Sequence, residues 1–159
     1  MKKLTAILTA LCLLCCACAA MADMEPPTWD SMPAAVVEDD NTTVELSAFE
    51  GEWVLNVAFA EETYVDEQTL FGSYDYNFMP FVIKEGKVTQ DRQNEYGEFV
   101  TLELPCTFEA GQLQGKDYNG RNVVFELLED GNIVMSVFFP GEGDKVTCLS
   151  VFLKHPEEN

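Results

Sequence analysis

The chain has 159 residues and a formal net charge of −19, from 28 acidic residues against 9 lysines and arginines. Binding to a nucleic acid needs clustered basic residues for the phosphates, so this composition excludes that class of partner. After residue 23, charged residues interrupt every apolar run before it is long enough to cross a bilayer.

Residues 1–22 have the order of an export signal. Met1, Lys2 and Lys3 form a basic start, an apolar run follows, and small residues lead up to Ala22. We therefore expect a cleaved signal peptide and an exported mature protein. All the acidic residues follow this segment, so removing Lys2 and Lys3 with it makes the net charge −21.

Two processing routes are consistent with the end of the signal. Ala20 and Ala22 fit the A-x-A pattern of a signal peptidase that would cut before Asp23 and release a secreted protein. The stretch Cys15-Cys16-Ala17-Cys18 resembles a bacterial lipobox, with Cys15 where Leu is usual. That resemblance implies a cell-envelope lipoprotein with its lipid on Cys18. Residues 23–43, rich in Pro, Ala and acids, are expected to be a flexible linker.

Cysteine and histidine usage limits the chemistry of the mature chain. Only Cys106 and Cys148 remain after the signal is removed. An exported protein permits one disulfide between them, and two separate buried thiols are the alternative. With one histidine, no C-x₂-C pair after the signal and no calcium-loop pattern among the acids, we expect neither a metal site nor a cofactor.

Residues 44–159 are expected to form one domain made of β-strands. Short runs of alternating apolar and polar residues are separated by turn signals such as Glu85-Gly86, Asn119-Gly120 and Asp130-Gly131. The expected strands are residues 51–60, 76–84, 87–92, 99–108, 112–116, 121–128, 132–139 and 145–153.

Eight strands joined in sequence by tight turns predict an all-β fold, an eight-stranded antiparallel up-and-down β-barrel. Residues 61–71 lack alternation, and a short helix or loop is expected there, after the first strand. A sandwich of two sheets is the alternative architecture.

The residues at the start of the first strand carry a family resemblance. Phe49-Glu50-Gly51-Glu52-Trp53 is similar to the F-x-G-x-W pattern of lipocalin-like barrels, and residues 47–154 resemble the lipocalin-like domains of bacterial exported proteins and lipoproteins. The resemblance implies that Trp53 closes one end of the barrel under a basic side chain, for which Lys154 is the candidate. A second signature of the T-D-Y type and a long helix after the barrel are not seen.

Catalysis is not expected. A nucleophilic enzyme usually pairs Ser, Cys or Thr with a histidine, and the one histidine, His155, is expected to be exposed in the tail. The resemblance and the apolar inward positions instead favour binding of a small hydrophobic or amphipathic ligand by a monomer. The alternative is a non-catalytic surface module that binds or inhibits another protein. A barrel cavity of roughly 300 Å³ or more would favour the ligand, and a packed interior would favour the module.

The candidate ligand-binding residues lie at inward positions and in the segment after the first strand. They are Trp53, Phe59, Tyr64, Phe78, Leu102, Leu104, Phe125 and Met135. Most of this set equally describes a packed hydrophobic core. Residues 61–72 are expected to gate any cavity, because Tyr64, Phe71, Tyr74 and Tyr76 gather aromatic side chains in and beside them.

Overall fold

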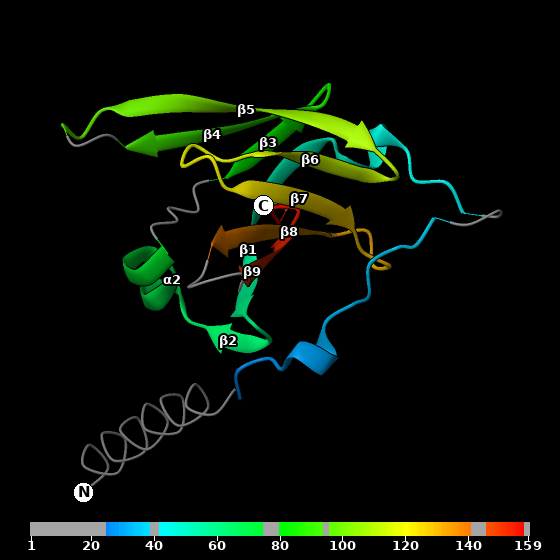
Figure 1. Cartoon of the computed structure of the whole chain (residues 1–159), viewed down its shortest axis with the longest axis horizontal. Coiled ribbons are helices and arrows are strands. Elements are labelled where there is room, and N and C mark those ends of the chain that lie inside the picture. Colours follow the sequence, from blue (N-terminus) through cyan, green and yellow to red (C-terminus); the bar gives the residue numbers. More distant parts are fainter. Residues whose placement is uncertain (1–24, 39–41, 75–79, 94–95, 141–145, 158–159) are drawn as a thin grey trace, which may run out of the picture.

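The computed structural model describes residues 25–38, 42–74, 80–93, 96–140 and 146–157. Within them the backbone forms a closed barrel with one α-helix and two short 3-10 helices (Figure 1). The elements are η1 (Trp29–Ser31), η2 (Leu46–Phe49), β1 (Gly51–Ala60), β2 (Thr63–Val65), α2 (Glu67–Tyr74), β3 (Phe81–Lys84), β4 (Lys87–Gln93), β5 (Phe99–Glu109), β6 (Gln112–Lys116), β7 (Asn122–Leu127), β8 (Ile133–Pro140) and β9 (Val146–Lys154).

The barrel wall consists of β1 and β3 to β9 in up-and-down order. Each strand pairs antiparallel with the next, and β9 pairs with β1 to close the ring. The short strand β2 adds to the end of β1, opposite residues 58–60. The predicted architecture is confirmed: the protein is an eight-stranded antiparallel up-and-down barrel with a short helix after the first strand.

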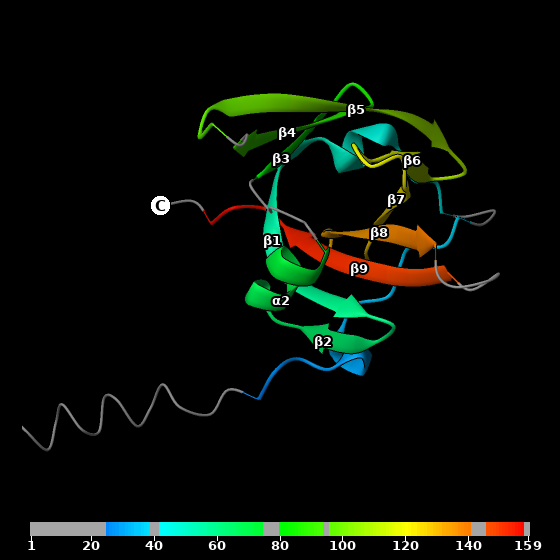
Figure 2. The same ribbon diagram turned by 60° about the vertical axis from the view of Figure 1, so that its left-hand side comes forward.

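The connections gather at two ends of the barrel because neighbouring strands run in opposite directions. The closed end carries η2 and the β3–β4, β5–β6 and β7–β8 connections. The open end carries β2, α2 and the β4–β5 and β6–β7 connections, and Figure 2 shows α2 and β2 beside β1 at this end. Residues 61–71, where a helix or loop was expected, thus contain β2 and the first five residues of α2.

Asp66 begins α2 as its N-cap. The backbone N–H of Thr69 donates to Asp66 Oδ1 at 2.7 Å, and the Thr69 hydroxyl donates to Oδ2 at 3.1 Å. These hydrogen bonds, the backbone one foremost, favour the ionised carboxylate and lower the pKa of Asp66. The capped helix places Leu70 in the main core, where it is fully buried.

Side chains that face into the barrel lie in register from strand to strand. One inward layer runs around six strands, and all its members belong to or pack against the main core. It comprises Phe108, Leu113, Phe125, Met135, Val151 and Ala58. The core therefore occupies the middle of the barrel.

The strand β1 changes face half-way along. Its pairing with β9 shifts register between Leu55 and Val57, which places Asn56 in a β-bulge. Leu55 packs against the main core, but beyond the bulge Ala58 faces that core and Phe59 faces outward. The prediction that Phe59 points inward is therefore wrong, because it assumed uninterrupted alternation.

The outer face of β1, β8 and β9, together with the residue after β7, carries a second apolar cluster. The cluster comprises Val57, Phe59, Leu128, Val134 and Phe152. It is covered by residues 29–38, which we name the N-terminal strap and which run along this side of the barrel in Figure 1. Trp29, Met32 and Ala35 of the strap pack against the cluster.

Backbone hydrogen bonds fix the strap beside the end of β7. Val36 N donates to Leu127 O at 2.8 Å, and Glu129 N donates to Ala34 O at 3.0 Å. β6 begins opposite Glu126, so the edge of β7 beyond that point has no β6 partner and bonds with the strap. The expectation of a flexible linker over residues 23–43 is thus corrected for residues 29–38, which are part of the domain.

The expected signal peptide and Cys18 lie outside the described residues. None of the helices in the described part of the chain has the length and hydropathy that a membrane crossing requires.

Candidate functional site

Four of the expected ligand-binding residues lie in the packed interior of the barrel. Trp53 and Phe125 have no exposed surface, Met135 is 1% exposed and Leu104 is 7% exposed. A side chain with no accessible surface borders no space that could hold a water molecule. The structure therefore places these side chains in the core of the domain, rather than on the wall of an open cavity.

The other four expected residues are scattered. Phe59 lies in the outer cluster, and Tyr64 of β2 is 41% exposed, with its ring edge-on to Phe59 at 6.3 Å between centroids. Leu102 is half-buried at an inward position of β5, opposite Gln90. Phe78 lies outside the described residues. The seven described residues of this set do not form one site.

Trp53 lies at the closed end, as the family resemblance implies. Its indole Nε1 donates to Phe49 O at 2.8 Å, and the ring of His155 stacks on it with centroids 3.9 Å apart. Lys154, the expected partner, instead pairs with Glu157 at 3.3 Å. Leu153 faces the core, so Lys154 points away and His155 returns to the barrel end.

His155 is therefore not a tail residue detached from the fold. A hydrogen bond of 3.1 Å joins its Nδ1 to Glu52 O, although the residue remains exposed to solvent. Ser150 lies on the outer face of β9, opposite Phe59. His155 and Ser150 thus lie on different parts of the barrel and do not form a catalytic pair.

Cys106 and Cys148, the cysteines of the described residues, are free thiols. Cys106 lies at an inward position of β5, opposite Gly115, and burial raises the pKa of its thiol. Cys148 lies on β9 next to the inward residue Leu149, so its side chain points to the other side of the wall. The barrel wall separates the two side chains, which is why the structure has two thiols and no bridge.

A hollow of about 320 Å³ lies between the strap and the outer face of the barrel. We name it the strap pocket. Its lining residues come from the strap and from β7, β8 and β9 with the residue after β7. They are Trp29, Asp30, Met32, Pro33, Ala34, Ala35, Glu126, Leu128, Val134, Ser136, Ser150 and Phe152.

One end of the strap pocket is aromatic. The ring of Trp29 stands edge-on to Phe152 at 5.8 Å and to Phe59 at 5.5 Å between centroids. Phe59 and Phe152 are in turn edge-on to each other at 5.8 Å. Three mutually perpendicular rings hold the start of the strap to the barrel and give this end a rigid apolar wall.

The floor of the pocket joins apolar and polar positions. Val134 of β8 lies opposite Phe152 of β9, and two positions along, Ser136 lies opposite Ser150. Ser136 is 9% exposed and Ser150 is 7% exposed, so both hydroxyl-bearing side chains are at least nine-tenths buried beneath the strap. The floor therefore offers hydrogen-bonding groups inside an apolar enclosure.

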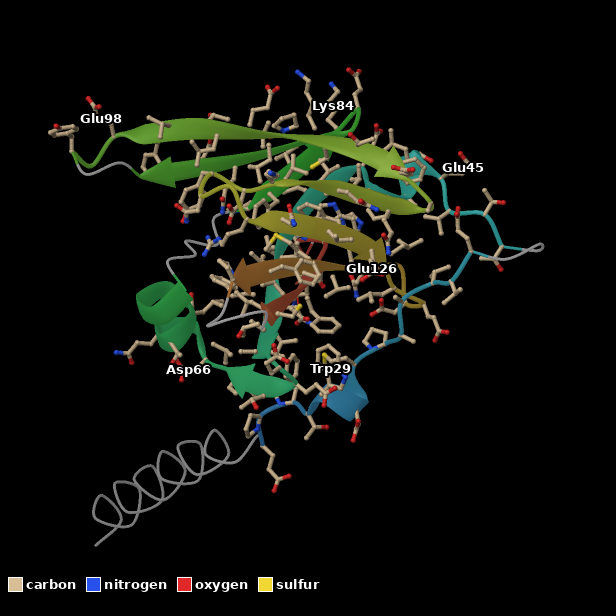
Figure 3. All side chains as sticks on the ribbon, in the orientation of Figure 1. Trp29, Glu45, Asp66, Lys84, Glu98 and Glu126 are labelled. Carbon is tan, nitrogen blue, oxygen red and sulfur yellow. The ribbon has the colours of Figure 1, made fainter. Side chains whose placement is uncertain are left out.

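Glu126 lines the pocket from β7. Its Oε1 accepts a hydrogen bond of 2.8 Å from Gln112 Nε2, and the side chain is half-buried. Figure 3 shows Glu126 on β7 and Trp29 at the start of η1, both on the side of the barrel that the strap covers. The described lining contains the carboxylates of Asp30 and Glu126 but no lysine or arginine.

Comparisons with known proteins assign no family. No family model and no curated protein matches the chain. Among solved structures, the chain is similar to a bovine odorant-binding protein in complex with a selenium-containing odorant. The two are 14% identical, with a TM-score of 0.44, over 77% of this chain and 80% of that chain.

The strap pocket was not predicted from the sequence, although one signal for it is present there. Residues 133–137 of β8 are buried on both faces, and their sequence, Ile-Val-Met-Ser-Val, has no polar residue except Ser136. A strand of this kind is covered on both sides, in contrast to one that alternates. Trp29, inside a segment otherwise typical of a linker, is the second signal.

Proposed function

We propose that this protein is an exported, non-catalytic binding domain that holds a small hydrophobic or amphipathic ligand in the strap pocket. The observation that supports the site is the lining of the pocket: in a hollow of about 320 Å³, the rings of Trp29 and Phe152 form an apolar wall beside buried serine hydroxyls. Ligand sites of roughly 300 to 1,000 Å³ with apolar walls and a few polar groups are typical of small-molecule binding. Among the described inward residues, Trp53, Phe125 and Met135 are buried in the core, and this burial supports a site on the outer face of the wall.

The chemistry of the pocket supports binding in preference to catalysis. Its hydroxyl groups, Ser136 and Ser150, have no histidine beside them, since His155 stacks on Trp53 at the closed end. Within the described residues, no three His, Cys, Asp or Glu side chains gather as metal ligands would. A serine without a base is a weak nucleophile.

Filling the pocket tests this function. Ser136→Phe puts a ring into the floor, and Thr107→Phe puts the same ring on an exposed, outward position of β5 that does not line the pocket. We expect the neutral fluorophore N-phenyl-1-naphthylamine to bind the wild type and Thr107→Phe saturably, and Ser136→Phe at least tenfold more weakly. Equal binding by the two folded variants would refute the strap pocket as the site.

Export and lipid attachment are the second part of the proposal. Cys18 follows the small residue Ala17, and the basic and apolar segments precede it. In the host, Cys18→Ala should move the protein from the membrane fraction to the soluble fraction, whereas Cys16→Ala should not. The mass of the mature N-terminus then gives the cleavage site, and a mature chain that begins at Asp23 in the wild type would exclude the lipoprotein.

A second candidate function, binding of another protein, is favoured by the tip of the β4–β5 hairpin at the open end. Tyr96 is 79% exposed, Phe99 is 64% exposed and Val100 is 40% exposed. Aromatic side chains at this exposure are typical of contact surfaces. A photo-crosslinking residue at position 99 should trap one specific partner that the same residue at Val82, 42% exposed on β3, does not.

A further inference from the structure

We propose that the ligand of the strap pocket is amphipathic with a cationic head group, an amine above all, and that Glu126 binds this head. The proposal rests on the proposed function, and it adds the charge and the orientation of the ligand. Its basis is the distribution of apolar, hydroxyl and carboxylate groups along the pocket.

The two ends of the pocket differ in polarity. Glu126, Val134 and Phe152 lie opposite one another on β7, β8 and β9. Neighbouring strands are about 4.8 Å apart, so the backbone of Glu126 is about 10 Å from that of Phe152. The rings of Trp29 and Phe152 form one end and the carboxylate forms the other. A ligand with an apolar body and a polar head matches this order.

The polar end is suited to a hydrogen-bond donor that carries positive charge. An ammonium group has three donors and no acceptor. Gln112 occupies Glu126 Oε1, and the second oxygen of the same carboxylate is available to accept from a ligand. The hydroxyl of Ser136 lies on the neighbouring strand and can accept a further hydrogen bond.

The charges around the pocket disfavour an anionic head. Asp30 on the strap is the other carboxylate of the lining, and it is exposed, so water screens it more than it screens the half-buried Glu126. The described lining supplies no positive charge to a fatty acid or a phosphate. The net charge of −19 adds a long-range field of the same sign.

The test compares three ligands that share an apolar chain and differ in the head: octylamine, octanol and octanoate. Each displaces N-phenyl-1-naphthylamine from the protein purified from its own host. We expect octylamine to compete on the order of tenfold better than octanoate at low salt, and this advantage to shrink as salt is added. Octanol should bind between the two and show no salt dependence.

Glu126→Gln assigns the effect to one side chain. It should reduce the affinity for octylamine to about that for octanol and leave octanol unchanged. Glu129→Gln is the matched control, because Glu129 is exposed, bonds to the strap only through its backbone N–H and does not line the pocket. Both variants lose one negative charge, so an equal effect would indicate the general field and overturn the role of Glu126.

The outcomes separate this inference from the function on which it rests. If the fluorophore binds in the pocket but octanoate competes as well as octylamine, the cationic head is refuted and the binding function stands. If the fluorophore does not bind the wild type, the binding function fails and the head-group assignment fails with it.

Discussion

The inner and outer faces of β8 and β9 belong to the same two strands but are packed differently. Inward residues such as Met135 and Val151 are enclosed by the other barrel strands, whose positions the closed hydrogen-bond ring fixes. Outward residues such as Val134 and Phe152 are covered by a strap that crosses them once. The inner face is therefore filled, whereas the outer face retains a pocket. A closed barrel of this size can thus hold a pocket on the outside of its wall.

The largest expected effect tests the packing of the inner face. Phe125→Ala should lower the free energy of unfolding by about 3 to 5 kcal/mol, because the enclosed layer cannot collapse around the lost ring. Val124→Ala, the half-buried outward neighbour, should cost about 1 kcal/mol. Urea unfolding measures both. A loss below about 1 kcal/mol for Phe125→Ala would show that neighbouring side chains can move into the space that the ring leaves.

The second effect tests the cover on the outer face. Trp29→Ala removes the ring that stands against Phe59 and Phe152 and should cost about 1 to 3 kcal/mol. It should also make the strap sensitive to protease, and Trp29→Phe should restore most of both properties. A strap that still resists protease in Trp29→Ala would show that its backbone hydrogen bonds are enough to hold it on the barrel.

A pair of glycines tests how the far end of the strap is fixed. Gly111 has φ +71° and Gly120 has φ +76°, so alanine at either position costs about 1 kcal/mol in backbone strain. An added Cβ at Gly111 would also lie 2.8 Å from the Glu38 side chain, whose Oε1 accepts a 3.0 Å hydrogen bond from Val44 N, whereas Gly120 has no such neighbour within 4 Å.

Gly111→Ala should therefore be less stable than Gly120→Ala by about 1 kcal/mol, the net worth of the displaced hydrogen bond. Thermal or urea unfolding gives the difference. In a Glu38→Ala background the two glycine variants should become equivalent, and a difference that persists there would mean that the Glu38 contact does not hold the strap.

The smallest effect concerns the thiol of Cys106. Burial raises its pKa, so the folded state keeps the proton that the unfolded chain releases at lower pH. The stability from this group is fully present below the unfolded pKa, about 8.5, and is lost as pH rises through the folded value. Stability should fall less between pH 8 and 10 in Cys106→Ala than in the wild type. If stability falls equally with pH in the two proteins, the titration of Cys106 does not contribute to stability.

The fold could be predicted from the sequence because each strand shows its own alternation of apolar and polar residues and typical turn residues separate the strands. Alternation from Val100 to Phe108 and the turn at Asp130-Gly131 give strand and connection without knowledge of distant residues. Eight such strands leave few alternatives to a barrel. The position of Trp53 at one end of the barrel was also predictable, from the F-x-G-x-W pattern to which it belongs.

The candidate site could not be predicted because it depends on non-local effects. The bulge at Asn56 turns Phe59 outward. The residue types in that strand do not indicate that a bulge is present. His155 instead of Lys154 reaches Trp53 because of where β9 meets the core. The composition of residues 23–43 suits a linker, yet Trp29 docks because an apolar face elsewhere in the chain needs cover.

With the proposed lipid on Cys18, the docked strap would also limit the distance between the domain and the membrane. A fully extended chain spans at most about 3.5 Å per residue, so a lipid on Cys18 would keep Trp29 within about 40 Å of the bilayer surface. A linker free up to Val44 would have allowed about 90 Å. The strap pocket would then sample only molecules close to the envelope, where amphipathic compounds concentrate.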